Sequence, residues 1–101
     1  MSLTTTPTQN ANTPSLATST AVLASNQYRQ GWQIQNQDNT HELYVCLGGT
    51  ASSSVYHFVL KACSAAHDGT GGSFSQLTGI VFTGAITCYS AGTPSYTVLE
   101  H

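Results

Sequence analysis

Residues 65–74, AAHDGTGGSF, hold the densest group of residues that could carry chemistry in this chain. His67 and Asp68 could ligate a metal ion, and the backbone N–H groups of a glycine-rich turn can bind phosphate. A P-loop, however, needs a lysine after its last glycine, and both P-loops and dinucleotide-binding loops lead into a helix. A calcium ion takes about six to eight oxygen ligands, and this stretch has one carboxylate. The residue types therefore exclude a phosphate or calcium site here.

The same stretch is interpreted as a conformationally demanding hairpin loop between two strands. Asp68-Gly69 is a dipeptide typical of turns. Gly71-Gly72 allows the chain to take positive φ angles before the extended pattern resumes. If this loop has a function, we expect it to contact a neighbouring subunit.

The rest of the chain gives no sign of catalysis. It has no G-x-S-x-G nucleophile motif. Carboxylates are too scarce for an acid–base pair, because Asp38 and Glu42 flank a turn and Asp68 lies in the glycine loop. We therefore expect a protein that is not an enzyme, with no catalytic residues and no cofactor.

The histidines are predicted to be ordinary surface or turn residues. His57 shares one strand parity with Val55 and Val59 and is expected to face solvent or an interface. His41 and His67 lie in turns, where an imidazole can bond to nearby backbone. Equivalent histidines sharing one ion on the axis of a symmetric assembly remain an alternative. No metal site is predicted.

The cysteines and aromatic residues are predicted to be structural. Cys46, Cys63 and Cys88 lie in apolar runs without a C-x-x-C spacing, which indicates buried free thiols. One disulfide with a spare thiol is the alternative. Trp32 and the five tyrosines fit core or subunit contacts, although they could also form a platform on which sugars stack.

Alternation of apolar and polar residues indicates β-strands from Val22 onward. The side chains predicted to face the core are Tyr28, Trp32, Ile34, Leu43, Val45, Leu47, Tyr56, Phe58 and Leu60. On the first of these strands, the side chains of the opposite face are polar and are predicted to be in contact with solvent: Arg29, Gln33 and Gln35. Residues 79–89 read as one strand in which Gly84 marks a bulge or bend. Six to seven short strands without helical periodicity predict an all-β fold, a small antiparallel β-sandwich or β-barrel.

The composition limits both the fold and the partners. Only 6% of the 101 residues are charged, and the formal net charge is −2. Without a basic patch, nucleic-acid binding is not expected, and the same shortage argues against a polybasic membrane anchor. No apolar stretch has the length of a membrane span.

The chain divides into three predicted parts. Residues 1–21 are uncharged, rich in threonine and low in complexity, and are expected to form an extended or disordered arm. Residues 22–98 form the β domain. Residues 99–101 resemble the start of a vector-derived tag. A domain this small gains stability from subunit contacts, so a homo-oligomer is expected, with a trimer favoured.

Four segments together resemble small virion structural proteins of tailed bacteriophages: YRQGWQIQN, LYVCLGG, YHFVLKACSAAHDGTGGSF and TGIVFTGAI. The likeness covers roughly residues 22–98, and DGTGG is its most specific part. His67 departs from the pattern, in which a polar or acidic residue is expected. The resemblance implies a non-enzymatic particle component of the capsid-decorating or cement type, and brings no catalytic residues.

These observations predict a decoration protein that binds and stabilises an assembled phage head. The expected partner is the major capsid protein or another virion protein. The expected location is the particle surface, after synthesis in the bacterial cytoplasm. The alternatives are a tail or fibre component and a carbohydrate-binding β-sandwich module. The candidate partner-contact residues are Thr5, Pro7, Pro14, His57, Asp68, Gly69, Gly71 and Gly72.

Overall fold

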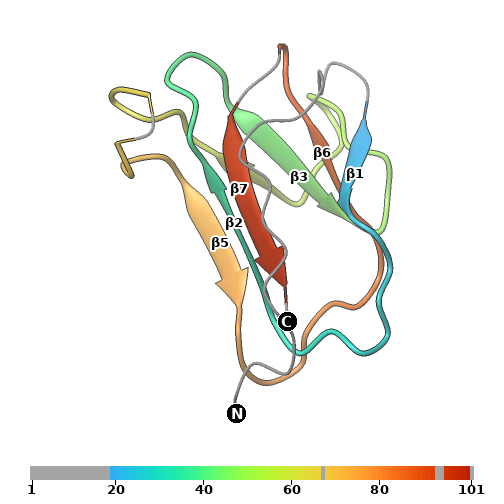
Figure 1. Cartoon of the computed structure of the whole chain (residues 1–101). Helices are drawn as coiled ribbons and strands as arrows, with labels where there is room; N and C mark the ends of the chain where they lie inside the picture. Colours follow the sequence, from blue (N-terminus) through green and yellow to red (C-terminus); the bar gives the residue numbers. More distant parts are fainter. Residues whose placement is uncertain (1–18, 67, 93–94, 101) are drawn as a thin grey trace.

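The computed structural model describes residues 19–66, 68–92 and 95–100, and in these residues every regular element is a β-strand. The strands are β1 (Thr20–Leu23), β2 (Trp32–Asn36), β3 (Leu43–Leu47), β4 (Phe58–Leu60), β5 (Ser73–Gln76), β6 (Ile86–Tyr89) and β7 (Tyr96–Glu100). They form two antiparallel sheets, of order β1-β6-β3-β4 and β5-β2-β7 (Figure 1). The all-β prediction is confirmed, and the two separate sheets favour the sandwich over a closed barrel. The described residues contain no helix long and apolar enough to cross a bilayer.

The core lies between the sheets and follows from the two-residue period of the strands. In β2, Trp32, Ile34 and Asn36 are buried, while Gln33 and Gln35 are partly exposed. The same alternation buries other core residues: Leu43, Val45, Ile86, Cys88, Tyr96 and Val98. Each large apolar side chain buried in this way contributes about 1.5–3 kcal/mol to folding.

Both predicted domain boundaries fall inside strands. Thr20 and Ala21, assigned to the arm, begin β1 and pair with Cys88 and Thr87 of β6. A register shift after Ala21 allows the consecutive residues Val22 and Leu23 both to be buried. At the other end, the tag-like residues Leu99 and Glu100 continue β7 and pair with Gln33 and Trp32. The β domain therefore extends beyond residues 22–98 in both directions.

The predicted side-chain direction, toward the core or toward solvent, is wrong for three residues that lie just before strands. Tyr28 is 79% exposed and Tyr56 is 45% exposed, whereas Arg29, predicted to be wet, is buried. The cause is the length of the strands. A turn occupies residues 26–29, with Arg29 N–H bonded to the Asn26 carbonyl at 3.0 Å, so the β2 alternation begins only at Trp32. Likewise β4 begins at Phe58, after Tyr56.

Residues 79–85 were predicted as part of one strand with 86–89, and this is wrong. Only β6, Ile86–Tyr89, is a strand, and Gly84 lies in the loop before it. The backbone carbonyls of this loop bond elsewhere: Thr83 accepts from Asn26 N–H at 2.8 Å, and Phe82 and Gly84 accept from the Arg29 side chain.

The cysteine prediction is confirmed, since Cys46, Cys63 and Cys88 are all buried and free. Cys88 lies in the core, where burial raises the pKa of its thiol to about 12. Cys63 donates to the Asn36 carbonyl at 3.3 Å. Buried free cysteines of this kind pack as small apolar groups.

Candidate interaction surfaces

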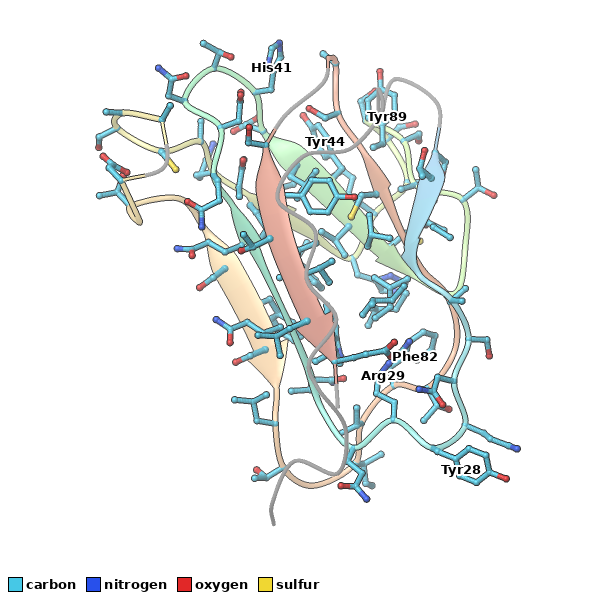
Figure 2. The ribbon with its side chains drawn as sticks, viewed as in Figure 1. Tyr28, Arg29, His41, Tyr44, Phe82 and Tyr89 are labelled. Atoms are coloured by element: carbon cyan, nitrogen blue, oxygen red, sulfur yellow. The ribbon has the colours of Figure 1, made fainter. Side chains whose placement is uncertain are left out.

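The two ends of the sandwich differ in chemistry. At one end lie the described residues of the connections 37–42 and 61–72, which we call the polar end (Figure 1). At the other end lie the connections 24–31 and 77–85, which we call the apolar end. His41 marks the polar end in Figure 2, and Tyr28 marks the apolar end.

The glycine loop at the polar end is organised by the Asp68 carboxylate. Its Oδ2 accepts from Ala65 N–H at 2.9 Å, and its Oδ1 accepts from the Thr70 N–H at 2.9 Å and the Thr70 hydroxyl at 2.6 Å. The Thr70 hydroxyl lowers the pKa of Asp68, and the backbone N–H bonds add to this. Gly69 takes φ +82°. Asp68 therefore uses its oxygens to hold its own loop, a role that suits a structural turn.

Two details of the loop prediction are corrected. First, the loop is no hairpin, because it connects β4 of the four-stranded sheet to β5 of the three-stranded sheet. Second, Gly71 and Gly72 do not have positive φ angles. Instead, a Cβ atom at Gly71 would overlap the Asn36 carbonyl oxygen, and one at Gly72 would lie 2.7 Å from Lys61 N. These glycines are required by close backbone packing where the chain crosses between the sheets.

Asp38, Thr40 and His41 form a second polar group at the same end. The Asp38 Oδ2 atom accepts from the Thr40 hydroxyl at 2.8 Å and from His41 N–H at 2.8 Å, and lies 3.0 Å from His41 Nδ1. The Thr40 hydroxyl also lies 2.9 Å from His41 Nδ1, so the polar contacts of the His41 ring stay within this turn. The group thus has the form of a side-chain-capped turn.

The pH dependence of stability tests this turn. Burial raises the pKa of Asp38, but hydrogen bonds from Thr40 and His41 outweigh it and lower the pKa from 3.8 to about 2. A carboxyl whose pKa is lower in the folded state stabilises the fold above its unfolded pKa, and this stability is lost as the pH falls toward 2. We expect the stability difference between the wild type and Asp38→Asn to shrink by about 1 kcal/mol between about pH 6 and pH 2, because solvent screens part of the effect. Urea unfolding at several pH values measures it, and parallel pH curves for the two proteins would contradict it.

Of the remaining partner-contact candidates, His57 lies in the described residues. His57 is exposed at the start of β4, at the opposite end of that strand from the glycine loop. Its Nδ1 accepts from Leu47 N–H at 2.9 Å, which fixes the ring against β3. Thr5, Pro7 and Pro14 lie outside the described residues, as does His67. Partner contact by these positions stays a prediction.

No cluster of metal ligands forms in the described ranges, where no three His, Cys, Asp or Glu side chains meet in a suitable arrangement.

Trp32 cannot serve as a platform for sugars. It is fully buried, its indole N–H donates to Gln76 Oε1 at 2.8 Å, and its ring packs 5.4 Å from that of Phe74. A tyrosine cluster lies elsewhere, on the four-stranded sheet (Figure 2). Tyr44 lies 5.1 Å from Tyr56 and 6.0 Å from Tyr89 between ring centroids, with all three rings tilted. This cluster brings aromatic rings near the surface, where Tyr56 is 45% exposed.

The apolar end carries the two most exposed large apolar side chains of the described residues, Ile80 and Tyr28. Ile80 is 97% exposed, Tyr28 is 79% exposed and Leu77 is 43% exposed. Figure 2 shows Tyr28 pointing away from the body of the sandwich. Sequence reasoning missed this surface because it placed Tyr28 and Ile80 on strands. The available signal was Gly79, which takes φ +78° and interrupts the extended pattern just before Ile80.

The Arg29 side chain braces the two connections of the apolar end. Its Nη2 donates to the Ala24 carbonyl at 2.6 Å, and its Nη1 donates to the carbonyls of Phe82 and Gly84 at 2.9 and 3.0 Å. Its Nε donates to Glu100 Oε1 at 2.8 Å, within an ion pair whose arginine side chain is fully buried. Figure 2 shows Arg29 beside Phe82, within the sandwich. The exposed side chains therefore stand on a fixed support.

Comparison of the chain with protein-family models, with curated proteins and with solved structures gives no match. The function is therefore inferred from the residues and their geometry.

Proposed function

We propose that this chain is a non-enzymatic structural protein of a phage particle, which attaches to the assembled head as a homo-oligomer and stabilises it. The observation that best supports assembly into a homo-oligomer is the apolar end, where Ile80 is 97% exposed and Tyr28 is 79% exposed on connections braced by Arg29. Apolar side chains grouped on a rigid surface are typical of sites for protein–protein contact. The scarcity of charge also allows many copies to pack closely without repulsion.

The proposed mechanism is mass action. A protein that binds the assembled shell and not its free subunits stabilises the shell by its binding free energy. The partner in this proposal is the major capsid protein or another virion protein. The resemblance to small tailed-phage virion proteins supports this choice of partner, and the segment before β1 is proposed to reach a neighbouring subunit.

Immunogold electron microscopy tests the proposal. Antibodies against the purified chain are expected to label the heads of the phage particles whose genome encodes it. Label on the tails would overturn attachment to the head in favour of the tail or fibre alternative. Particles without label would overturn the virion assignment altogether.

A truncated chain tests the part proposed for the N-terminal segment. The deletion should end at residue 18, because the Ser19 hydroxyl accepts from Ala51 N–H at 3.0 Å and Thr20 begins β1. We expect a chain without residues 2–18 to keep its folded β domain and to bind particles that lack the protein more weakly than the full chain. Equal binding in a sedimentation assay would contradict a bridging role for this segment.

A carbohydrate-binding module is the second candidate, and the tyrosine cluster is the observation that favours it. Tyr56 is 45% exposed, and its ring lies against that of Tyr44, whose hydroxyl donates to Glu42 Oε1 at 3.5 Å. A glycan array separates the two proposals, with Tyr56→Ala as the variant that should lose binding if this candidate is correct.

A further inference from the structure

A hollow lies between the two connections of the apolar end, beside the most exposed apolar side chain of the described residues. It has a volume of about 460 Å³ and is lined by Arg29, Gln30, Thr78, Gly79 and Val81. Ile80 lies in the sequence between two lining residues, yet 97% of its surface is in solvent. A projecting side chain and a recess thus stand next to each other on one short segment.

We propose that two copies of this chain pair through their apolar ends, with Ile80 of each copy seated in the hollow of the other. When a projection and a recess lie side by side on one surface, a two-fold axis between them places each projection in the opposite recess. One kind of contact then buries both isoleucines. A cyclic trimer needs the projection and the recess on differently directed faces. The geometry therefore points to a two-fold pair, in place of the trimer expected from the sequence.

The charge of this surface fits a second copy. Arg29 is the one charged residue in the connections 24–31 and 77–85, and its side chain is fully buried and paired with Glu100. Two identical surfaces can therefore approach without repulsion between like charges. The hollow is lined by the uncharged side chains of Gln30 and Thr78, which can form hydrogen bonds at the rim of the contact.

The surface is already in a fixed shape before pairing. The Thr83 carbonyl accepts from Asn26 N–H at 2.8 Å and from the Ser25 hydroxyl at 3.3 Å. The Arg29 side chain also donates to three backbone carbonyls, those of Ala24, Phe82 and Gly84. Little loop ordering is then needed on association, which favours affinity. Pairing does not depend on attachment to a phage particle, so it can be tested on the purified chain alone.

Sedimentation equilibrium over a concentration series measures the pairing. We expect the wild type to approach the mass of two chains as the concentration rises. Ile80→Asp should weaken pairing by about a hundredfold or more, because a two-fold contact loses two buried isoleucines and gains two buried carboxylates. Ile80 is almost fully exposed, so this variant should keep the wild-type unfolding temperature. The matched control is Val55→Asp, at a 53% exposed residue of another connection, which should leave pairing unchanged.

A pair of introduced cysteines tests directly whether Ile80 of one copy lies in the hollow of the other. The three native cysteines are buried, so cysteines introduced at the surface can be crosslinked selectively. A mixture of the Ile80→Cys and Thr78→Cys variants should give a crosslinked heterodimer with a short bifunctional maleimide. In addition, Thr78→Trp should fill the hollow and weaken pairing as Ile80→Asp does.

Three results would overturn the proposal: a wild type that stays monomeric at every concentration, a mass of three chains, or pairing that survives Ile80→Asp. A monomer whose binding to phage particles is abolished by Ile80→Asp would assign the surface to a foreign partner, and so would also overturn self-pairing.

Discussion

Arg29→Ala is expected to lower the free energy of unfolding by about 3–5 kcal/mol, the loss typical of breaking a buried charged network. The substitution leaves the carbonyls of Ala24, Phe82 and Gly84 without their side-chain donor, and removes the partner of Glu100. These three hydrogen bonds are partly buried. A fully buried acceptor that is left unpaired costs about 1–3 kcal/mol, so each of these carbonyls adds at most that much to the loss. Small domains are stable by only about 5–15 kcal/mol in total, so the variant should lie close to the unfolding threshold.

Urea unfolding of matched variants separates the parts of this network. Arg29→Lys should recover only part of the loss, because an ammonium group cannot reproduce the planar fork that reaches four acceptors. Glu100→Gln should have a much smaller effect, because the amide oxygen can still accept from Nε and the three carbonyls keep their donors. If Arg29→Ala were no less stable than Glu100→Gln, the proposed bracing role of the guanidinium would be wrong.

Gly71→Ala is expected to be the second severe change, with a loss of about 3 kcal/mol or more. The added Cβ atom would overlap the backbone oxygen of Asn36 and lie 2.8 Å from the sulfur of Cys63. Neither neighbour can move easily. Asn36 is fully buried, its N–H donates to the Gly72 carbonyl at 2.9 Å, and its side chain holds the carbonyls of His41 and Leu60. The crossing between the sheets would have to shift as a whole.

Gly69→Ala is the matched control in the same loop. No atom lies within 4 Å of a Cβ built there, but the φ of +82° is unfavourable for a residue with a side chain. The expected cost is about 1 kcal/mol, and Gly69→Asn should cost less because asparagine tolerates this conformation. Thermal unfolding of the three variants gives the ranking. If Gly71→Ala were as stable as Gly69→Ala, close packing at residue 71 would not be the reason for its glycine.

The strands and most of the core were predictable because period two acts locally. Trp32, Ile34, Leu43 and Val45 have the alternation that a half-buried strand requires, and all four are fully buried. Arg29 was beyond this kind of reasoning. Its burial depends on carbonyls as far along the chain as Phe82 and Gly84, and no local pattern reports such partners.

In the glycine loop, too, some features could be predicted from the local sequence and others depend on distant residues. The residue types alone were enough to reject phosphate and calcium binding, because those sites need a lysine, a helix or more carboxylates than Asp68 supplies. The role of Gly71 was not accessible in this way, because the Asn36 oxygen that forbids a side chain there belongs to β2, which is far from Gly71 in the sequence. For the apolar end, the sequence contains the exposed residues, but their exposure follows from strand limits that the alternation did not predict.

The order of strands in the sheets has a consequence for how the chain folds. Among the described strands, only β3 and β4 are both consecutive and paired, whereas β1 pairs with β6 and β2 pairs with β7. For nearly every strand pair, a long loop must therefore close, at a cost in entropy, before the contacts between the strands can form. This is typical of slow-folding β proteins. During synthesis, β2 lacks its partner β7 until residues 96–100 have left the ribosome. The domain should consequently complete its folding only once β7 is available, with its partly paired sheets open to aggregation until then.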